Sequence, residues 1–349
     1  MRPMLHDWLK PAWQQLLARR AQLHHALLIH GPAGIGKSGF ATELARALLC
    51  DAPLPDGTAC GRCAACGWFE QRNHPDFRLL TPAAMEEASE SEEGAAEERP
   101  GRSARKGSGK PSREIRVEQV RALERFTEVG GHRGGHKIIV IDPADALNVV
   151  AANALLKTLE EPSGSTRFVL VTSRPDALPA TIRSRCRLVS LPIPAPDAAA
   201  DWLARDAGVD VGQARAWLAA AGGAPLHARR FADPAQAAIH RTIVEALAGI
   251  PETGVVQTAD ALTGIETPVW AGLLQRWIVD LQRVRAGAEP RYFPDRAQRL
   301  QALARRTGLP ALERLARQVD ELVRTADHPL NPRLVIEDAL LRVRAALAG

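Results

Sequence analysis

The sequence predicts an α/β domain with a parallel sheet, followed by an all-α region. Short apolar runs at 25–29, 138–141 and 168–171 have the length and composition of buried strands. Helical patterns separate these runs, and strands that alternate with helices build a parallel sheet with helices on both faces. Beyond Leu191 the chain shows only Ala/Leu/Arg-rich helical patterns. These observations together favour one sheet domain before a helical C-terminal half.

Composition limits the class of protein. The chain has 349 residues, of which 46% are hydrophobic, enough for two or three domains. Its net charge of +5 permits contact with nucleic acid without arguing for it. No run of about eighteen apolar residues is present, and Asp7 and Lys10 interrupt the place where a signal peptide would be apolar. We therefore expect a cytoplasmic protein without a membrane span.

The elements of the first domain follow in order. The strand at 25–29 leads through a glycine-rich turn into a helix that ends near Cys50. An amphipathic helix is expected at 115–126, before the strand at 138–141. The helix N-V-V-A-A-N-A-L-L-K-T-L-E-E should stop before Pro162, because proline disfavours helix in the residue before it.

Residues 84–113 form a low-complexity segment with acidic residues first and basic residues after them. Met85 is its only large apolar residue, so the segment cannot bury enough surface to offset its ordering entropy. We expect a disordered surface insertion, with a charged docking arm as the alternative.

The proline-rich stretch L-P-I-P-A-P at 191–196 indicates a linker. We expect three domains: an α/β domain over 1–193, a small helical unit over 194–234 and a larger helical unit over 235–349.

A phosphate-binding loop is the most specific motif in the chain. G-P-A-G-I-G-K-S at 31–38 fits G-x-x-x-x-G-K-[ST] and lies between a predicted strand and a predicted helix. Gly31, Gly34 and Gly36 allow the backbone N–H groups to face phosphates, and the helix N-terminus adds a favourable dipole. Lys37 is expected to reach the β and γ phosphates, and Ser38 to bind magnesium. The alternative is a relic loop that holds no nucleotide.

The strand at 138–141 leads into Asp142 and Pro143. A carboxylate at the end of such a strand suits the magnesium ion of a bound nucleotide, although it could also be a simple strand-end cap. Turnover needs a side chain that orients the attacking water, and proline cannot do this. Asp145, three residues on, is expected to cap the next helix, and no catalytic role is assigned to it. The sequence therefore predicts a site that can bind ATP but lacks the side chain needed to hydrolyse it.

Four cysteines lie close together in the sequence: Cys50, Cys60, Cys63 and Cys66. Four thiolates suit a closed tetrahedral zinc site, which is structural because no coordination position remains for water. Free thiols or an iron–sulfur cluster are the alternatives. The fifth cysteine, Cys186, is expected to be buried as a small apolar side chain.

Three features resemble the bacterial clamp-loader ATPases of the AAA+ class, which serve DNA polymerase III. They are the P-loop, the four-cysteine module directly after its helix, and N-A-L-L-K-T-L-E-E-P at 153–162 with S-R-C at 184–186. N-P-R-L-V-I-E-D-A-L-L-R at 331–342 is similar to the last helix of the family's collar. The resemblance implies a RecA-like AAA+ domain with a zinc module, a helical lid and a helical collar that assembles a ring.

Departures from the family pattern separate motor subunits from a stator-like subunit. Asp142-Pro143 stands where a motor carries Asp-Glu, and Leu226 or His227 stands where a motor carries the sensor-2 arginine. The chain also stops after the collar region, so no extension like that of tau is expected. The resemblance thus implies the stator-like type, with little or no ATPase activity of its own.

Roles carried over from the family fall on specific residues. Arg185 of S-R-C corresponds to the arginine that reaches the ATP of the adjacent subunit in trans, and Ser173 lies in the sensor-1 region with Thr172. Arg183, Arg185 and Arg187 alternate, so an extended backbone would place them on one face. The implied partners are the gamma/tau and delta subunits, and through them the sliding clamp and primer–template DNA. Zinc and ATP with magnesium are the implied cofactors.

Three alternatives remain open. A gamma- or tau-like motor would hydrolyse ATP by itself. A P-loop kinase with a zinc lid would transfer phosphate to a small acceptor without a ring of partners. A zinc-dependent nucleic-acid-binding protein would need a base-reading element, which the sequence does not show.

Overall fold

The computed structural model describes residues 5–85, 87, 112–128, 135–250, 252–326 and 331–347. The chain divides into two compact units, Met1–Ile193 and Pro194–Gly349. The predicted α/β class is confirmed, with a parallel sheet in the first unit and helices alone in the described part of the second. No helix in the described ranges combines the length and apolar character that crossing a membrane requires.

The first unit contains a five-stranded parallel sheet in the order β2-β3-β4-β1-β5. Its strands are β1 (Ala26–His30), β2 (Phe77–Leu80), β3 (Lys137–Ile141), β4 (Thr166–Thr172) and β5 (Arg187–Ser190). The central strands β1, β3 and β4 are the three that the sequence predicts. The edge strands β2 and β5 were not predicted, because their residues are largely exposed and lack a buried apolar run.

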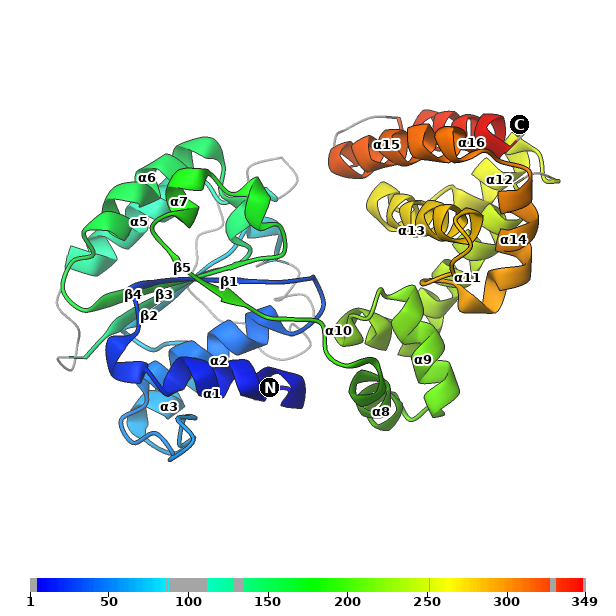
Figure 1. The fold of residues 1–349 in the computed structure, drawn as a ribbon. Coiled ribbons are helices and arrows are strands. Elements are labelled where there is room, and N and C mark those ends of the chain that lie inside the picture. The colour runs from blue at the N-terminus through cyan, green and yellow to red at the C-terminus, as the bar shows by residue number, and fades with distance from the viewer. Residues whose placement is uncertain are drawn as a thin grey trace. The chain divides into compact units, whose positions relative to one another are not determined.

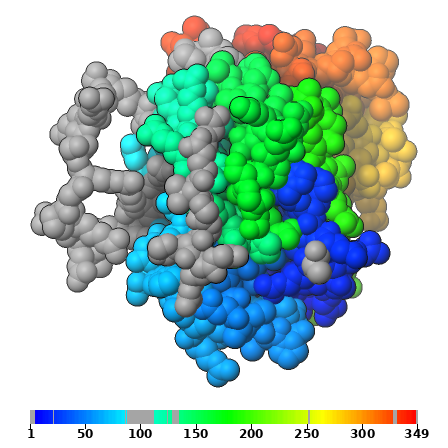
Figure 2. Space-filling view, turned by 90° about the vertical axis from the view of Figure 1, so that its left-hand side faces the viewer, coloured from blue at the N-terminus to red at the C-terminus, as the bar shows by residue number. Residues whose placement is uncertain are grey.

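Helices cover both faces of this sheet (Figure 1). One layer holds α1 (Lys10–Leu17), α2 (Lys37–Leu49) and α3 (Ala64–Glu70), and the opposite layer holds α5 (Val117–Glu128), α6 (Val149–Glu160) and α7 (Ala180–Arg183). Alternate strand residues serve the two layers: Ile29 packs with the first, and Leu28 with the second. The surfaces of α5 and α6 lie beside each other in teal and green in Figure 2.

Short 3-10 turns connect these elements: η1 (Asp7–Leu9), η2 (Arg20–Gln22), η3 (Ala144–Ala146) and η4 (Pro175–Ala177). The predicted disordered insertion at 84–113 lies for the most part outside the described residues. At its ends, the Ala84 N–H donates to the Ser112 carbonyl over 3.1 Å. The two ends of the insertion are therefore joined beside the sheet.

The second unit holds two helical cores. The first is formed by α8 (Pro196–Ala207), α9 (Val211–Ala220), α10 (Pro225–Ala228) and η5 (Arg229–Ala232). The second is formed by α11 (Pro234–Ala248), α12 (Val255–Leu262), α13 (Thr267–Arg285), η6 (Pro294–Arg296), α14 (Ala297–Arg305), α15 (Leu309–Thr325) and α16 (Pro332–Leu347). Trp270 and Trp277 of α13 are fully buried in the second core. The further division of this unit at residue 234 stays a prediction.

Candidate functional site

The loop between β1 and α2 places glycine where a side chain would not fit. At Gly36, φ is +97°, and an added Cβ would lie 2.9 Å from the His6 ring. At Gly31 an added Cβ would lie only 2.2 Å from the Leu191 carbonyl oxygen. Gly34 also has a positive φ, of +76°. The loop therefore turns tightly and leads into the N-terminus of α2, where a phosphate would be favoured.

Lys37 begins α2 and is almost fully buried. Its Nζ donates to the Pro32 carbonyl at 2.6 Å and to the Ser173 hydroxyl at 2.8 Å. Burial lowers the pKa of Lys37, while the nearby Asp142 and Asp145 carboxylates oppose that effect. The structure thus brings together Lys37 and Ser173, two residues that the sequence assigns to one nucleotide site.

Ser38 and Asp142 meet at the carboxyl end of β3. The Ser38 hydroxyl hydrogen-bonds to the Asp142 carboxylate, which lowers the pKa of Asp142, but burial has the larger effect and raises it. A hydroxyl beside a carboxylate is a pair of oxygen ligands that suits Mg²⁺. These two residues fit the magnesium site of a nucleotide held by the loop.

Asp145 is not a helix cap, so that prediction is wrong. Its carboxylate accepts hydrogen bonds from the Thr172 hydroxyl at 2.7 Å and from Arg174 Nε at 2.9 Å. The cap of α6 is Asn148, whose Oδ1 accepts from the Ala151 N–H at 2.9 Å. Because Pro143 has no polar side-chain atom and Asp145 is engaged at the end of β4, neither offers a free carboxylate that could orient a water.

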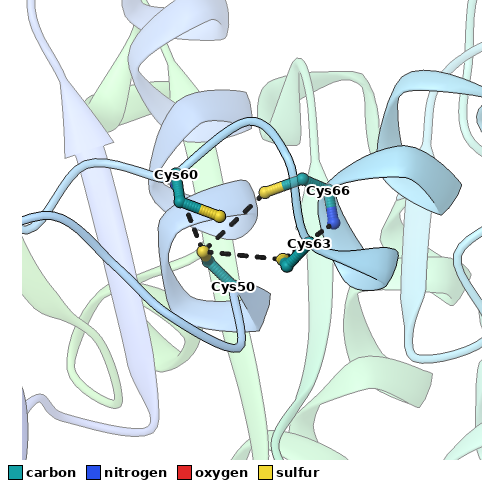
Figure 3. A group of neighbouring side chains, drawn as sticks. All are labelled: Cys50, Cys60, Cys63 and Cys66. Carbon is teal, nitrogen blue, oxygen red and sulfur yellow. Dashed lines mark hydrogen bonds between the residues drawn. The ribbon is translucent and has the colours of Figure 1, made fainter.

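The four clustered cysteines converge after the end of α2 (Figure 3). Their sulfur atoms all lie within 4.8 Å of one another. Cys50 Sγ lies 3.9 Å from Cys63 Sγ and 3.7 Å from Cys66 Sγ. A tetrahedral zinc site with Zn–S bonds of about 2.3 Å has sulfur atoms about 3.8 Å apart. The cluster of Cys50, Cys60, Cys63 and Cys66 could therefore hold a metal ion such as zinc.

Backbone N–H groups support these sulfur atoms. The Cys60 N–H points to Cys50 Sγ at 3.3 Å, and the Cys66 N–H points to Cys63 Sγ at 3.4 Å. Hydrogen bonding from the Arg62 backbone helps to lower the pKa of Cys60 to about 6, whereas burial raises the pKa of Cys66 to about 12. A bound cation would favour the thiolate form of all four.

A buried arginine joins the cysteine module to the P-loop helix. Arg46 of α2 pairs with Glu43 one turn earlier at 3.7 Å and with Glu70 at the end of α3 at 2.9 Å. Burial raises the pKa of Glu43, and Arg46 opposes that effect. The ion pair with Glu70 fixes α3 against α2, and so keeps Cys66 of α3 and its N-cap residue Cys63 in place opposite Cys50.

Arg185 lies far from the P-loop within the first unit. It precedes β5, while the P-loop follows β1, and these two strands are parallel neighbours. Arg185 is thus at the amino edge of the sheet, and the P-loop is at the carboxyl edge. Strands of this length span about 15 Å, so Arg185 cannot reach a nucleotide held by its own loop.

The prediction that Arg183, Arg185 and Arg187 lie on one face of an extended chain is wrong. Arg183 ends α7, Arg185 lies in the turn after it, and Arg187 begins β5. Arg183 pairs with Asp176 at 2.8 Å, and Arg185 pairs with Glu160. The backbone is therefore helical and then turned where the alternation assumed an extended chain.

The expected sensor-2 position and Cys186 are the remaining residues that the sequence singled out. Leu226 and His227, at the expected sensor-2 position, both lie in α10, which contains no arginine. Cys186 packs partly buried against the second face of the sheet, and burial raises the pKa of its thiol to about 11.

Sequence reasoning missed the N-terminal segment that packs on the P-loop. The Trp8 indole N–H donates to the Ile35 carbonyl at 2.9 Å. The His6 ring stacks on Trp8 with centroids 4.4 Å apart. No periodicity marks this segment, and Trp8 in H-D-W-L was the only available signal.

Comparison with known proteins places these features in a family. A family model described as DNA polymerase III, delta subunit, matches residues 9–195, more than half of the chain. A second model, for the C-terminal part of that subunit, matches residues 241–345.

Curated relatives are described as the delta' subunit of DNA polymerase III. DNA polymerase III subunit delta' of Pseudomonas aeruginosa is 40% identical over 65% of this chain and 61% of its own length. The Escherichia coli delta' subunit is 29% identical over 97% of this chain and 95% of its own. Among solved structures, a gamma subunit-related protein of Thermotoga maritima is 14% identical, with a TM-score of 0.41, over 96% of this chain and 99% of its own.

Proposed function

The chain belongs to the delta' family of DNA polymerase III subunits, and on that premise we propose that it works in the cytoplasm as a stator-like clamp-loader subunit. In this role it joins gamma/tau and delta subunits in a ring that loads the sliding clamp onto primer–template DNA. It holds ATP with magnesium, does not hydrolyse it, and supplies Arg185 to a neighbouring motor.

The observation that carries this proposal is the position of Arg185 at the sheet edge opposite the P-loop. An arginine that acts on ATP from this edge must act on the ATP of another subunit. Guanidinium suits the task because it is planar, always charged and binds two oxygens at once. The turn that carries Arg185 follows α7, so the chain presents the residue at the surface, where its side chain is one third exposed.

The lack of a base at Asp142-Pro143 supports a holding role for the P-loop. Lys37, Ser38, Asp142 and Ser173 meet as phosphate and magnesium ligands would, yet Pro143 cannot orient water and Asp145 is engaged. The four cysteines would hold a structural zinc ion that stabilises the segment between α2 and α3. The zinc ion would link the two ends of this segment and would take no part in ATP chemistry.

Replacing Arg185 with alanine tests the proposal. The chain is mixed with gamma/tau and delta subunits, and DNA-stimulated ATPase and ring assembly are measured. Turnover at the neighbouring site should fall by roughly 10³-fold or more, because a trans arginine stabilises transition-state charge. Arg183→Ala is the matched control, since Arg183 is similarly exposed and pairs with Asp176 instead. Unchanged ATPase with intact assembly would remove the finger assignment.

A further inference from the structure

Glu160 holds Arg185 in place within the free chain. Its Oε1 accepts from Arg185 Nε at 2.6 Å and also pairs with Nη2 of the same guanidinium. On the other side, Arg185 Nη1 donates to the Thr181 carbonyl at 2.9 Å. Glu160 is the last residue of α6 and Thr181 lies in α7, so two separate helices determine where the guanidinium lies.

These contacts leave part of the guanidinium available. An arginine has five N–H donors, of which Glu160 and Thr181 accept three. The Ser184 hydroxyl, 3.5 Å from Nη1, is at the limit of hydrogen-bond distance. Two donors therefore remain for the phosphate oxygens of another subunit, while the other three fix the orientation of the side chain.

A carboxylate beside a catalytic arginine has two opposing effects on its interaction with a phosphate. Its charge offsets part of the positive charge that the phosphate would meet. Against this, it removes rotamers from a side chain that otherwise must be ordered at the moment of reaction. Because the pair is partly exposed, solvent screens the charge offset while the geometric restraint remains.

We propose that Glu160 is the positioning residue of the trans arginine: it pre-orients Arg185 for the ATP of the neighbouring subunit. This inference rests on the proposed function of Arg185. Glu161 provides the control position for Glu160. It is the next residue, it is exposed, and it has no ion pair among the described residues. The motif L-E-E-P thus contains two glutamates with different roles.

The test uses the reconstituted complex with Glu160→Gln, Glu160→Ala, Glu161→Gln and Arg185→Ala. The Arg185-dependent ATPase is the wild-type rate minus the Arg185→Ala rate. Glu160→Gln should lower the kcat of this component about tenfold and Glu160→Ala about 100-fold, because misplacing a positioned group by about 1 Å can have an effect of that size. Glutamine keeps an oxygen acceptor and so should rescue part of the rate. KM for ATP and ring assembly should not change.

The outcomes separate the two proposals. If Arg185→Ala leaves the ATPase unchanged, the finger role itself is wrong. If Arg185→Ala lowers it but both Glu160 variants match Glu161→Gln, or exceed the wild type, the finger stands and the positioning role of Glu160 is overturned. In the isolated chain, the Arg185 Nε–H should exchange with solvent faster in Glu160→Ala than in Glu161→Gln, and equal exchange rates would also overturn the inference.

Discussion

His240 of α11 illustrates how a single residue makes stability depend on pH. Its ring lies against Phe231 and Phe293, and its buried Nε2 has no hydrogen-bond partner among the described residues. Burial lowers the pKa of His240, and the nearby Arg276 guanidinium lowers it further, with Asp295 opposing both. The folded chain therefore binds a proton at this site less readily than the unfolded chain.

The lowered pKa of His240 determines how the free energy of unfolding changes with pH. Since the folded pKa lies below the unfolded value near 6.5, the stability contributed by neutral His240 is present above that pH. It is lost progressively as the pH falls toward the folded pKa. We expect His240→Phe to flatten the fall in the free energy of unfolding between pH 7 and pH 5, as measured by urea denaturation at each pH. A slope equal to that of the wild type would show that His240 is not responsible.

At the scale of elements, the segment between α2 and α3 depends on its cysteines. Residues 51–63 contain no helix or strand, and their order comes from Cys50, the turn residues and α3. In Figure 3 the sulfur atoms of Cys60, Cys63 and Cys66 face that of Cys50. A metal ion at the centre would replace the apolar core that such a short segment cannot build.

We therefore expect one zinc ion per chain, and its removal should destabilise the first unit. Cys63→Ser should lose the metal and lower the melting temperature by at least about 5 °C, because each kcal/mol shifts it by about 2–4 °C in a unit of this size. Cys186→Ser, which lies outside the cluster, should keep the metal. Metal content by mass spectrometry and calorimetry measure the two effects, and a full metal complement in Cys63→Ser would contradict the assignment.

At the scale of the molecule, we expect the chain to bind nucleotide without hydrolysing it. Magnesium-ATP at about 100 times its Kd should stabilise the first unit by about 2.7 kcal/mol. Lys37→Ala should abolish this stabilisation, because Lys37 is the basic residue of the phosphate-binding loop at 31–38. Lys157→Ala, on the exposed side of α6, is the control.

The isolated chain should show no ATP turnover above background in the same samples. Calorimetry with and without nucleotide measures binding, and phosphate release measures turnover. Turnover that Lys37→Ala abolishes would instead assign the chain to the motor type.

The sequence by itself determined the features that lie within one continuous stretch. The loop at 31–38, the cysteine spacing and the buried strands β1, β3 and β4 were all evident, because their chemistry depends on residues a few positions apart. The three central strands were visible because both of their faces are buried, so they are apolar throughout.

Only the tertiary structure decided features that join distant residues. The pair of Arg185 with Glu160 spans 25 positions, and that of Thr172 with Asp145 spans 27. The edge strands β2 and β5 depend on pairing with a neighbour, since their own residues are too exposed to mark them. Side chains such as Asp145 and Arg185 take the partners that packing brings near, and sequence spacing does not contain that information. This is why a resemblance in sequence could suggest a role for Arg185, whereas only the fold shows its partner, Glu160.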